Sequence, residues 1–203
     1  MKQLLCLGDS ITDANRLFGN KPLGEGYVSY LSEKLGATWQ IRNRGVDGFT
    51  VKRVLEQMER EYCHFCPDVI TLLIGINDVG MMESTNRTPQ QKAEMSEEFS
   101  ITYEKLLALL NCYGHTRILL LEPFLFPFPA EFKSWFPQTA ELSRRIRDIA
   151  DKHQLEFLPL WEPLLTLAEE NGIRQISPDG IHLTSLGHKF LANRLFEKIN
   201  LKI

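Results

Sequence analysis

The sequence has no apolar run that approaches the roughly 20 residues needed to span a bilayer, so nothing in it indicates a membrane protein. Its first residues, MKQLLCLGDS, reach a Gly-Asp-Ser turn too soon for the apolar region of a signal peptide, which favours a cytoplasmic protein. A basic patch is missing as well, and the net charge is −3, so we expect no nucleic-acid partner.

Cysteine is scarce, with four in 203 residues. Cys63 and Cys66 form a C-x-x-C pair, a pattern that in other proteins holds zinc or carries out redox chemistry. A zinc site needs about two further ligands at compatible spacing, and His64 alone lies nearby. A redox pair opens a helix, where the helix dipole lowers the thiol pKa, whereas this pair follows the helical pattern of residues 50–62. We therefore expect ordinary reduced thiols, no metal and no cofactor.

The chain alternates short apolar runs with amphipathic stretches. Runs such as VITLLIG, residues 69–75, are apolar on both faces, which suits a sheet that is covered on both sides. Alternating strands and helices predict parallel strands joined by right-handed crossovers. With no internal repeat or linker, the chain predicts a single domain over residues 1–203. The predicted strands are 3–7, 38–43, 68–74, 117–122 and 155–160, and the predicted helices are 26–36, 50–62, 95–112, 138–153, 162–171 and 185–199.

Four loops that we expect at the carboxyl edge of this sheet carry polar motifs. Open parallel sheets place their functional groups beyond the carboxyl ends of their strands. The motifs are GDS at 8–10, NRGVDG at 43–48, GIND at 75–78 and SPDGIHLT at 177–184. The sequence therefore predicts that groups far apart along the chain meet at one edge.

These motifs contain the parts of an acyl-transfer site. A serine hydroxyl becomes an effective nucleophile when a neighbouring base takes its proton, and histidine suits that role near neutral pH. The histidine needs an acceptor for its other nitrogen, which a D-x-x-H turn such as Asp179 to His182 supplies. The developing oxyanion needs donors, which N–H groups of a glycine-rich turn and the amide of Asn77 can provide. Ser10, after the first strand, is the candidate nucleophile.

Each motif has a purely structural interpretation when taken alone. Gly-Asp-Ser is common in turns, a D-x-x-H histidine often caps a helix, and Asn77 or Asp78 could bond its own backbone in a turn. All four motifs in this order favour catalysis. For the remaining histidines we expect surface or structural roles; these are His64, His115, His153 and His188.

The segments GDSITD, NRGVDG, GIND and DGIHL resemble the first, second, third and fifth blocks of the GDSL (SGNH) hydrolases, a family of serine esterases and lipases. The resemblance runs from residue 4 to about residue 190. It implies a flavodoxin-like three-layer α/β/α sandwich with a five-stranded parallel sheet. Within the family, GDSITDANR, GEGYVSYL and IGINDV look most like intracellular bacterial members that include acetylxylan esterases, which remove acetyl groups from short xylan fragments.

The resemblance also implies roles for individual residues. Ser10 would be the nucleophile, and Asp179 and His182 would complete its triad. Gly48 and Asn77 would join the Ser10 N–H in the oxyanion hole. Asp9 would help to shape the turn that presents Ser10.

The most unusual stretch is EPFLFPFPAEFKSWFPQ, residues 122–138, which holds four prolines, five phenylalanines and Trp135. Three interpretations stay open: a proline-stiffened loop whose phenylalanines fill the core, an aromatic wall where Trp135 binds substrate beside Ser10, or a contact in a homo-oligomer. Residues 80–95 are polar and predict a mobile excursion near Asn77.

The sequence thus predicts an α/β serine esterase that hydrolyses small acyl esters, preferably acetyl esters of carbohydrate, through an acyl-enzyme. Its partner would be a small-molecule ester, with no membrane and no metal involved. The main alternative is a lysophospholipase or thioesterase with the same triad. Two others are a metal-dependent phosphatase that uses Asp9 as a ligand, which lacks a second carboxylate-rich motif, and a catalytically silent sugar-binding module.

Overall fold

The computed structural model describes residues 1–112 and 114–201, apart from the side chain of Cys63. The Cys63 half of the C-x-x-C pair therefore lies outside the described side chains. Cys6, Cys66 and Cys112 are free thiols, Cys6 buried and the other two exposed. None of the described helices combines the length and the apolar character that crossing a bilayer requires.

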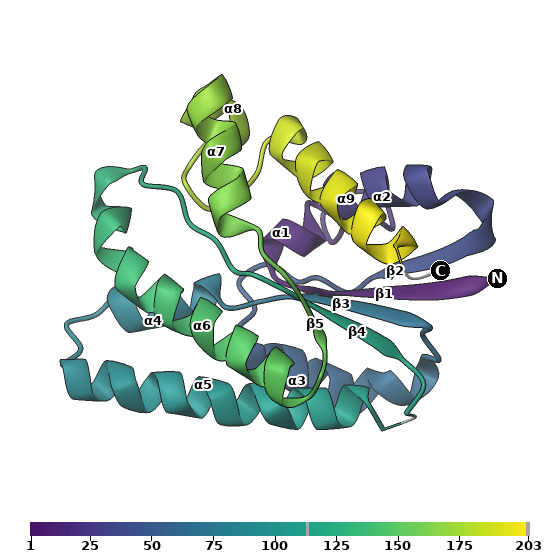
Figure 1. Ribbon diagram of the computed structural model, residues 1–203, viewed down its shortest axis with the longest axis horizontal. Coiled ribbons are helices and arrows are strands. Elements are labelled where there is room, and N and C mark those ends of the chain that lie inside the picture. Colours follow the sequence, from purple (N-terminus) through teal and green to yellow (C-terminus); the bar gives the residue numbers. More distant parts are fainter. Residues whose placement is uncertain (113, 202–203) are drawn as a thin grey trace.

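Five strands form one all-parallel sheet in the order β2-β1-β3-β4-β5 (Figure 1). This is the strand order of flavodoxin-like folds, and it confirms the five-stranded parallel sheet expected from the sequence. All residues of the central strand β3 are buried, as its two apolar faces predict. The strands are β1 (Lys2–Gly8), β2 (Trp39–Asn43), β3 (Val69–Leu73), β4 (Arg117–Leu121) and β5 (Glu156–Leu158).

Helices cover both faces of the sheet and make it the middle of three layers (Figure 1). Along β1, Leu5 and Leu7 join one apolar core, whereas Leu4 and Cys6 join the other, because successive side chains of a strand point to opposite faces. The first core packs under α3 (Val51–Glu61), α4 (Ile76–Glu83), α5 (Pro89–Leu110) and α6 (Phe136–Lys152). The second packs under α2 (Tyr27–Leu35), α7 (Trp161–Asn171), α8 (Ile173–Ile176) and α9 (Ser185–Asn200).

The prediction of a mobile excursion at residues 80–95 is wrong, because residues 80–83 end α4, residues 89–95 begin α5, and residues 84–88 form the short connection between them. Thr88 caps α5: its hydroxyl accepts from the N–H of Gln91 at 3.2 Å, and the Gln91 side chain accepts from the N–H of Thr88 at 2.9 Å. Glu83 and Lys92 form an ion pair at 2.6 Å between the two helices. The polar side chains thus belong to helix surfaces, and the capping box was readable in the sequence as Thr-Pro followed by glutamine.

Candidate active site

Ser10 lies at the carboxyl end of β1, as the first residue of the short helix α1 (Ser10–Asp13). Asp9 caps this helix, since its carboxylate accepts from the N–H of Ile11 at 3.0 Å. This bond confirms that Asp9 shapes the turn, and full burial raises the pKa of Asp9 to about 7. The backbone N–H of Ser10 is in the first helical turn, where N–H groups have no partner within the helix, so it is available to a ligand.

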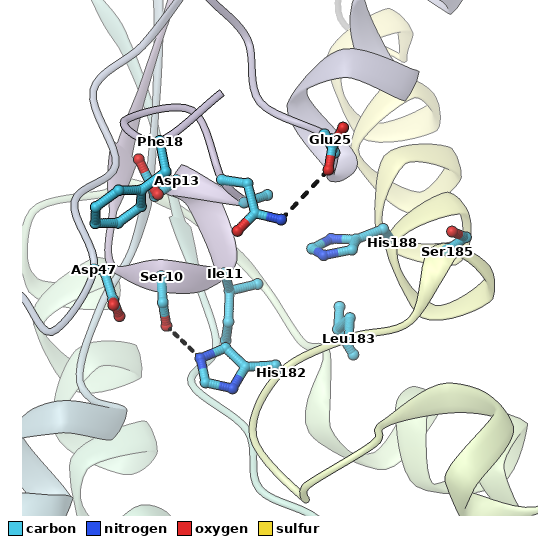
Figure 2. A pocket seen from close by; sticks show the side chains of 12 residues that line it. Ser10, Ile11, Asp13, Phe18, Glu25, Asp47, His182, Leu183, Ser185 and His188 are labelled. Carbon is cyan, nitrogen blue, oxygen red and sulfur yellow. Dashed lines mark hydrogen bonds between the residues drawn. The ribbon is translucent and has the colours of Figure 1, made fainter. Parts of the chain in front are cut away.

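Ser10, His182 and Asp179 form one hydrogen-bonded chain. His182 Nε2 lies 2.9 Å from Ser10 Oγ, the contact drawn in Figure 2, and His182 Nδ1 lies 2.6 Å from Asp179 Oδ2. Partial burial raises the pKa of Asp179, but the hydrogen bonds from His182 and from the N–H of Ile181 outweigh it and lower the pKa overall. An ionised carboxylate can only accept, so it fixes the proton of a neutral His182 ring on Nδ1 and leaves Nε2 to accept from Ser10.

The loop that carries Asp179 and His182 is held in a tight turn at Gly180. Gly180 has a φ of +94°, and a Cβ at this position would collide with the carbonyl oxygen of Phe128. Its N–H donates to Ser177 Oγ at 2.8 Å. Asp179 Oδ1 also accepts from the N–H of His182 at 2.8 Å, so one carboxylate holds both the imidazole and its backbone.

Gly48 lies in the loop after β2, and Asn77 lies in the first turn of α4, directly after β3. Asn77 Nδ2 donates to the carbonyl oxygen of Phe49 at 3.0 Å, and the N–H of Val46 donates to the carbonyl oxygen of Gly8 at 3.2 Å. A side-chain amide has two N–H bonds, so this contact orients Asn77 and leaves the second N–H for a ligand. Gly48 is exposed with a φ of +72°, a conformation that favours glycine.

The carboxylate of Asp78 fixes the beginning of α3. It accepts from the N–H of Val51 at 3.2 Å, which supplies the side-chain cap that Thr50 does not give. Burial raises the pKa of Asp78 to about 7. In the first turn of α4, Asn77 thus holds the loop after β2, and Asp78 holds the beginning of α3.

A cavity of about 350 Å³ opens beside Ser10 (Figure 2). His188, for which we expected a surface or structural role, is buried in its wall, with 8% of its surface exposed. No local pattern in the sequence separates His188 from the other histidines in helical stretches. The cavity is lined by Ser10, Ile11, Asp13, Ala14, Asn15, Phe18, Glu25, Asp47, His182, Leu183, Ser185 and His188.

Trp135 is not among the residues that line this cavity. It ends the 3₁₀ helix η3 (Ala130–Trp135), and its ring packs on Phe132 with the ring centres 4.6 Å apart. Phe124 and Phe126 are buried, which confirms the core-filling interpretation for these two residues. A role for Trp135 in binding substrate stays a prediction.

Asp9, the metal ligand of the phosphatase alternative, lies in the interior of the protein. Its carboxylate is almost fully buried and bonded to the N–H of Ile11, so it does not open into the cavity. Over residues 1–112 and 114–201, no three described histidine, cysteine, aspartate or glutamate side chains lie close enough together to hold a metal ion.

Two known proteins match nearly the whole chain in sequence. The acetylxylan esterase of Geobacillus stearothermophilus is 25% identical over 213 residues, which cover 98% of this chain and 94% of that protein. The human isoamyl acetate-hydrolyzing esterase 1 homolog is 23% identical over 217 residues, which cover 99% of this chain and 82% of that protein.

Solved structures agree with the fold. A Parabacteroides merdae protein described as a GDSL-like lipase superposes with a TM-score of 0.80 at 29% identity, covering 98% of this chain and 96% of that chain. The crystal structure of the Geobacillus stearothermophilus acetylxylan esterase gives a TM-score of 0.77 at 25% identity, with 98% and 94% covered.

A sequence model of the GDSL-like lipase/acylhydrolase family matches residues 6–190, which include all four polar motifs. This match confirms the family that the motifs resemble, and the sheet order and the structural neighbours agree with it. The chain therefore belongs to the GDSL-like lipase/acylhydrolase family and is a hydrolase of carboxylic esters.

Proposed function

We propose that the protein hydrolyses acetyl esters of small carbohydrates, with Ser10 as nucleophile, His182 as general base and Asp179 as the group that orients His182. The observation that carries this proposal is the chain of contacts from Ser10 Oγ to His182 Nε2 at 2.9 Å and from His182 Nδ1 to Asp179 at 2.6 Å. Both distances lie within the range in which a proton can pass between hydrogen-bonded groups.

In the first half of the reaction, His182 Nε2 takes the proton of Ser10 as its Oγ attacks the ester carbonyl carbon. The carbonyl oxygen becomes an oxyanion, which accepts from the N–H of Ser10, the N–H of Gly48 and the free amide N–H of Asn77. When the tetrahedral intermediate collapses, the protonated His182 gives its proton to the alcohol oxygen. The alcohol leaves, and the acyl group stays bound to Ser10.

The second half repeats these steps with water. His182 takes a proton from a water molecule, the resulting hydroxide attacks the acyl carbon, and the same three donors stabilise the oxyanion. His182 then returns the proton to Ser10 Oγ, which releases the carboxylic acid. Asp179 stabilises the positively charged His182 ring in both halves.

The comparisons support the acetyl half of the substrate more directly than the alcohol half. One relative is an acetylxylan esterase, and the name of the other refers to isoamyl acetate. Both names specify an acetyl group, but one alcohol is a polysaccharide and the other is a short branched alcohol. Acetyl specificity is therefore the part of the proposal with the broader support.

Two experiments test the proposal: covalent labelling identifies the nucleophile, and a series of esters measures the preference for acyl chain length. A phosphonate inhibitor should attach to Ser10, and Ser10→Ala should lose about 10⁴-fold or more in kcat while keeping its circular-dichroism spectrum. Among 4-nitrophenyl esters, kcat/KM should be highest for the acetate and fall with chain length. Label on another serine would overturn the nucleophile, and a preference for long acyl chains would favour the lysophospholipase or thioesterase alternative.

A further inference from the structure

The cavity beside Ser10 extends over His182 toward α9, and Asp47, next to Gly48, also lines it. Its wall runs from Ser10 over His182 and Leu183 to His188 on α9, and neither Gly48 nor Asn77 lines it. In the mechanism above, His182 protonates the alcohol oxygen, so the leaving group has to lie within reach of Nε2. Given the proposed function, the alcohol half of the ester is therefore the part that enters this cavity.

His188 presents one hydrogen-bond donor to this cavity. Its Nδ1 accepts from the backbone N–H of Tyr27 at 3.2 Å, so the proton of the neutral ring is on Nε2. Among the described residues, Nε2 has no hydrogen-bond partner, although 92% of the residue is buried. Burial, and then the nearby His182, lower the pKa of His188 to about 4, so the ring is neutral near pH 7.

The ring of His188 is held rigidly in the cavity wall. A Cβ on Gly26 would lie 2.8 Å from His188 Cε1, so the glycine of the GEGY stretch lets the backbone approach the ring. The ring also stacks near Tyr27, with ring centres 6.5 Å apart and an interplanar angle of 26°. A donor fixed in this way loses little conformational entropy when a ligand binds.

Three carboxylates also line the cavity, together with Asn15 and Ser185, whose side chains can both donate and accept. Asp13 and Glu25 line it as ion-paired carboxylates, Asp13 with Arg16 at 3.6 Å and Glu25 with Lys21 at 2.9 Å. Asp47 adds a further carboxylate at the rim. Carboxylates accept hydrogen bonds from hydroxyl groups and repel phosphate or carboxylate groups, and the two ion pairs reduce the attraction for an amine.

We propose that this cavity selects the alcohol half of the ester, that this half is a small, uncharged polyhydroxylated group, and that the Nε2–H of His188 hydrogen-bonds to one of its hydroxyl groups. The cavity volume of about 350 Å³ suits a group of sugar size. His188 then determines which alcohols the cavity accepts. The chemical steps need no residue beyond those named under the proposed function.

The first experiment uses the unmodified protein and three acetyl esters: a monoacetylated methyl glucoside, cyclohexyl acetate and monoacetylated glucose 6-phosphate. The second keeps a six-membered ring without hydroxyl groups, and the third adds negative charge. Each kcat/KM is divided by the rate constant of that ester with hydroxide, which removes differences in intrinsic reactivity. The glucoside ester should exceed both others by about tenfold or more, which two or three cavity hydrogen bonds can supply.

The second experiment compares His188→Asn with the matched surface variant His153→Asn. The asparagine oxygen takes the place of Nδ1 and still accepts from Tyr27, whereas the Nε2–H donor is lost. The ratio of kcat/KM between the glucoside ester and cyclohexyl acetate should fall about fivefold to tenfold in His188→Asn, the effect of one hydrogen bond. His153 is half-exposed at the end of α6, so its variant should keep the ratio.

The outcomes separate the two proposals. If the unmodified protein hydrolyses none of the acetyl esters above background, the proposed function is wrong. If it hydrolyses 4-nitrophenyl acetate but treats the glucoside and cyclohexyl esters equally, the esterase stands and this inference is overturned. An unchanged ratio in folded His188→Asn overturns the role of His188. If that variant does not fold, the comparison of the three esters with the unmodified protein still decides whether the cavity selects a polyhydroxylated alcohol.

Discussion

Two kinds of segment meet at the carboxyl edge of the sheet, and they differ in what their side chains do. The loops with the polar motifs place Ser10 and His182 on the surface of a cavity. The segment 122–138 is far richer in aromatic residues, yet its Phe124 and Phe126 are buried, and Trp135 packs on Phe132. Apolar burial is enough to explain the aromatic residues, whereas burial does not explain a linked serine, histidine and aspartate.

The aromatic segment supports the loop that carries Asp179 and His182. The N–H of Phe126 donates to the carbonyl oxygen of Gly180 at 2.9 Å, and the Phe128 carbonyl packs against the Cα of the same glycine. Trp161 Nε1 in turn donates to the carbonyl oxygen of Leu125 at 2.6 Å. We therefore expect the loops with the polar motifs to carry the chemistry and the segment 122–138 to support them, and the following changes test that expectation.

Asn77→Ala tests the chemical side and should have the largest effect of these changes. Removal of one oxyanion donor typically lowers kcat by about 10²–10³-fold. KM for 4-nitrophenyl acetate should change little, because the oxyanion exists only after attack. Steady-state kinetics on the purified variant measures kcat and KM separately. A change confined to KM would show that Asn77 binds the substrate in its ground state.

Gly180→Ala tests the contact between the two regions. The new Cβ would meet the Phe128 carbonyl oxygen, so the loop has to shift. A displacement of about 1 Å in a catalytic group can cost about 10²-fold in rate, and we expect a loss of kcat of that order.

Gly172→Ala is the matched control for this substitution. Gly172 has a φ of +91°, close to the +94° of Gly180, but a Cβ there would have open space. Both variants should be destabilised by the unfavourable backbone conformation, and Gly180→Ala alone should lose kcat. Equal rates in the two variants would contradict the supporting role of the segment.

Trp135→Ala tests the supporting side. Loss of this half-buried ring from its contact with Phe132 should lower the free energy of unfolding by about 2 kcal/mol. For a ring that acts only as support, the ratio of kcat/KM between an acetylated sugar and 4-nitrophenyl acetate should stay the same. Thermal unfolding and kinetics on both substrates measure the two effects, and a selective loss on the sugar ester would instead support substrate binding by Trp135.

Asp9→Asn tests whether the buried carboxyl group below Ser10 makes the stability of the fold depend on pH. Burial raises the pKa of Asp9 from 3.8 to about 7, so the fold favours the neutral carboxyl group. The resulting stabilisation is complete below the unfolded pKa of 3.8 and is lost as the pH rises through about 7. The free energy of unfolding should therefore fall less between pH 4 and pH 8 in Asp9→Asn than in the unmodified protein.

Denaturant unfolding at several pH values measures this slope, with Asp148→Asn as the control. The Asp148 side chain is 59% exposed and pairs with Arg144 on the surface of α6, so its removal should leave the slope unchanged. An identical slope in Asp9→Asn would show that the pKa of Asp9 is not raised in the folded protein.

The features that the sequence predicted are those set by local pattern or by specific chemistry. The five strands were predicted because apolar runs and amphipathic stretches differ in period. Ser10 and His182 were predicted as site residues because their motifs have few structural explanations in combination. These two residues are 172 positions apart, and the prediction that they meet depended on the rule for parallel sheets.

The features that the sequence did not predict depend on tertiary contacts. His188 is buried because its ring meets the backbone of Tyr27, 161 residues away, and no local pattern records that contact. The orientation of the 122–138 segment depends on which surfaces are left for Phe124 and Phe126 to cover. The beginning of α5 is different, because its capping box at Thr88 and Gln91 was present in the sequence and could have been used.

The central claim is that Asp179 and His182 serve one proton transfer with Ser10, and a double-mutant cycle tests it most directly. The measurement is kcat for Asp179→Ala, His182→Ala and the double variant with 4-nitrophenyl acetate. Substitutions within one catalytic unit have strongly non-additive effects on the rate. The double variant should therefore be no more than about threefold slower than His182→Ala alone. A double variant whose loss in activation free energy equals the sum of the two single losses would contradict the claim.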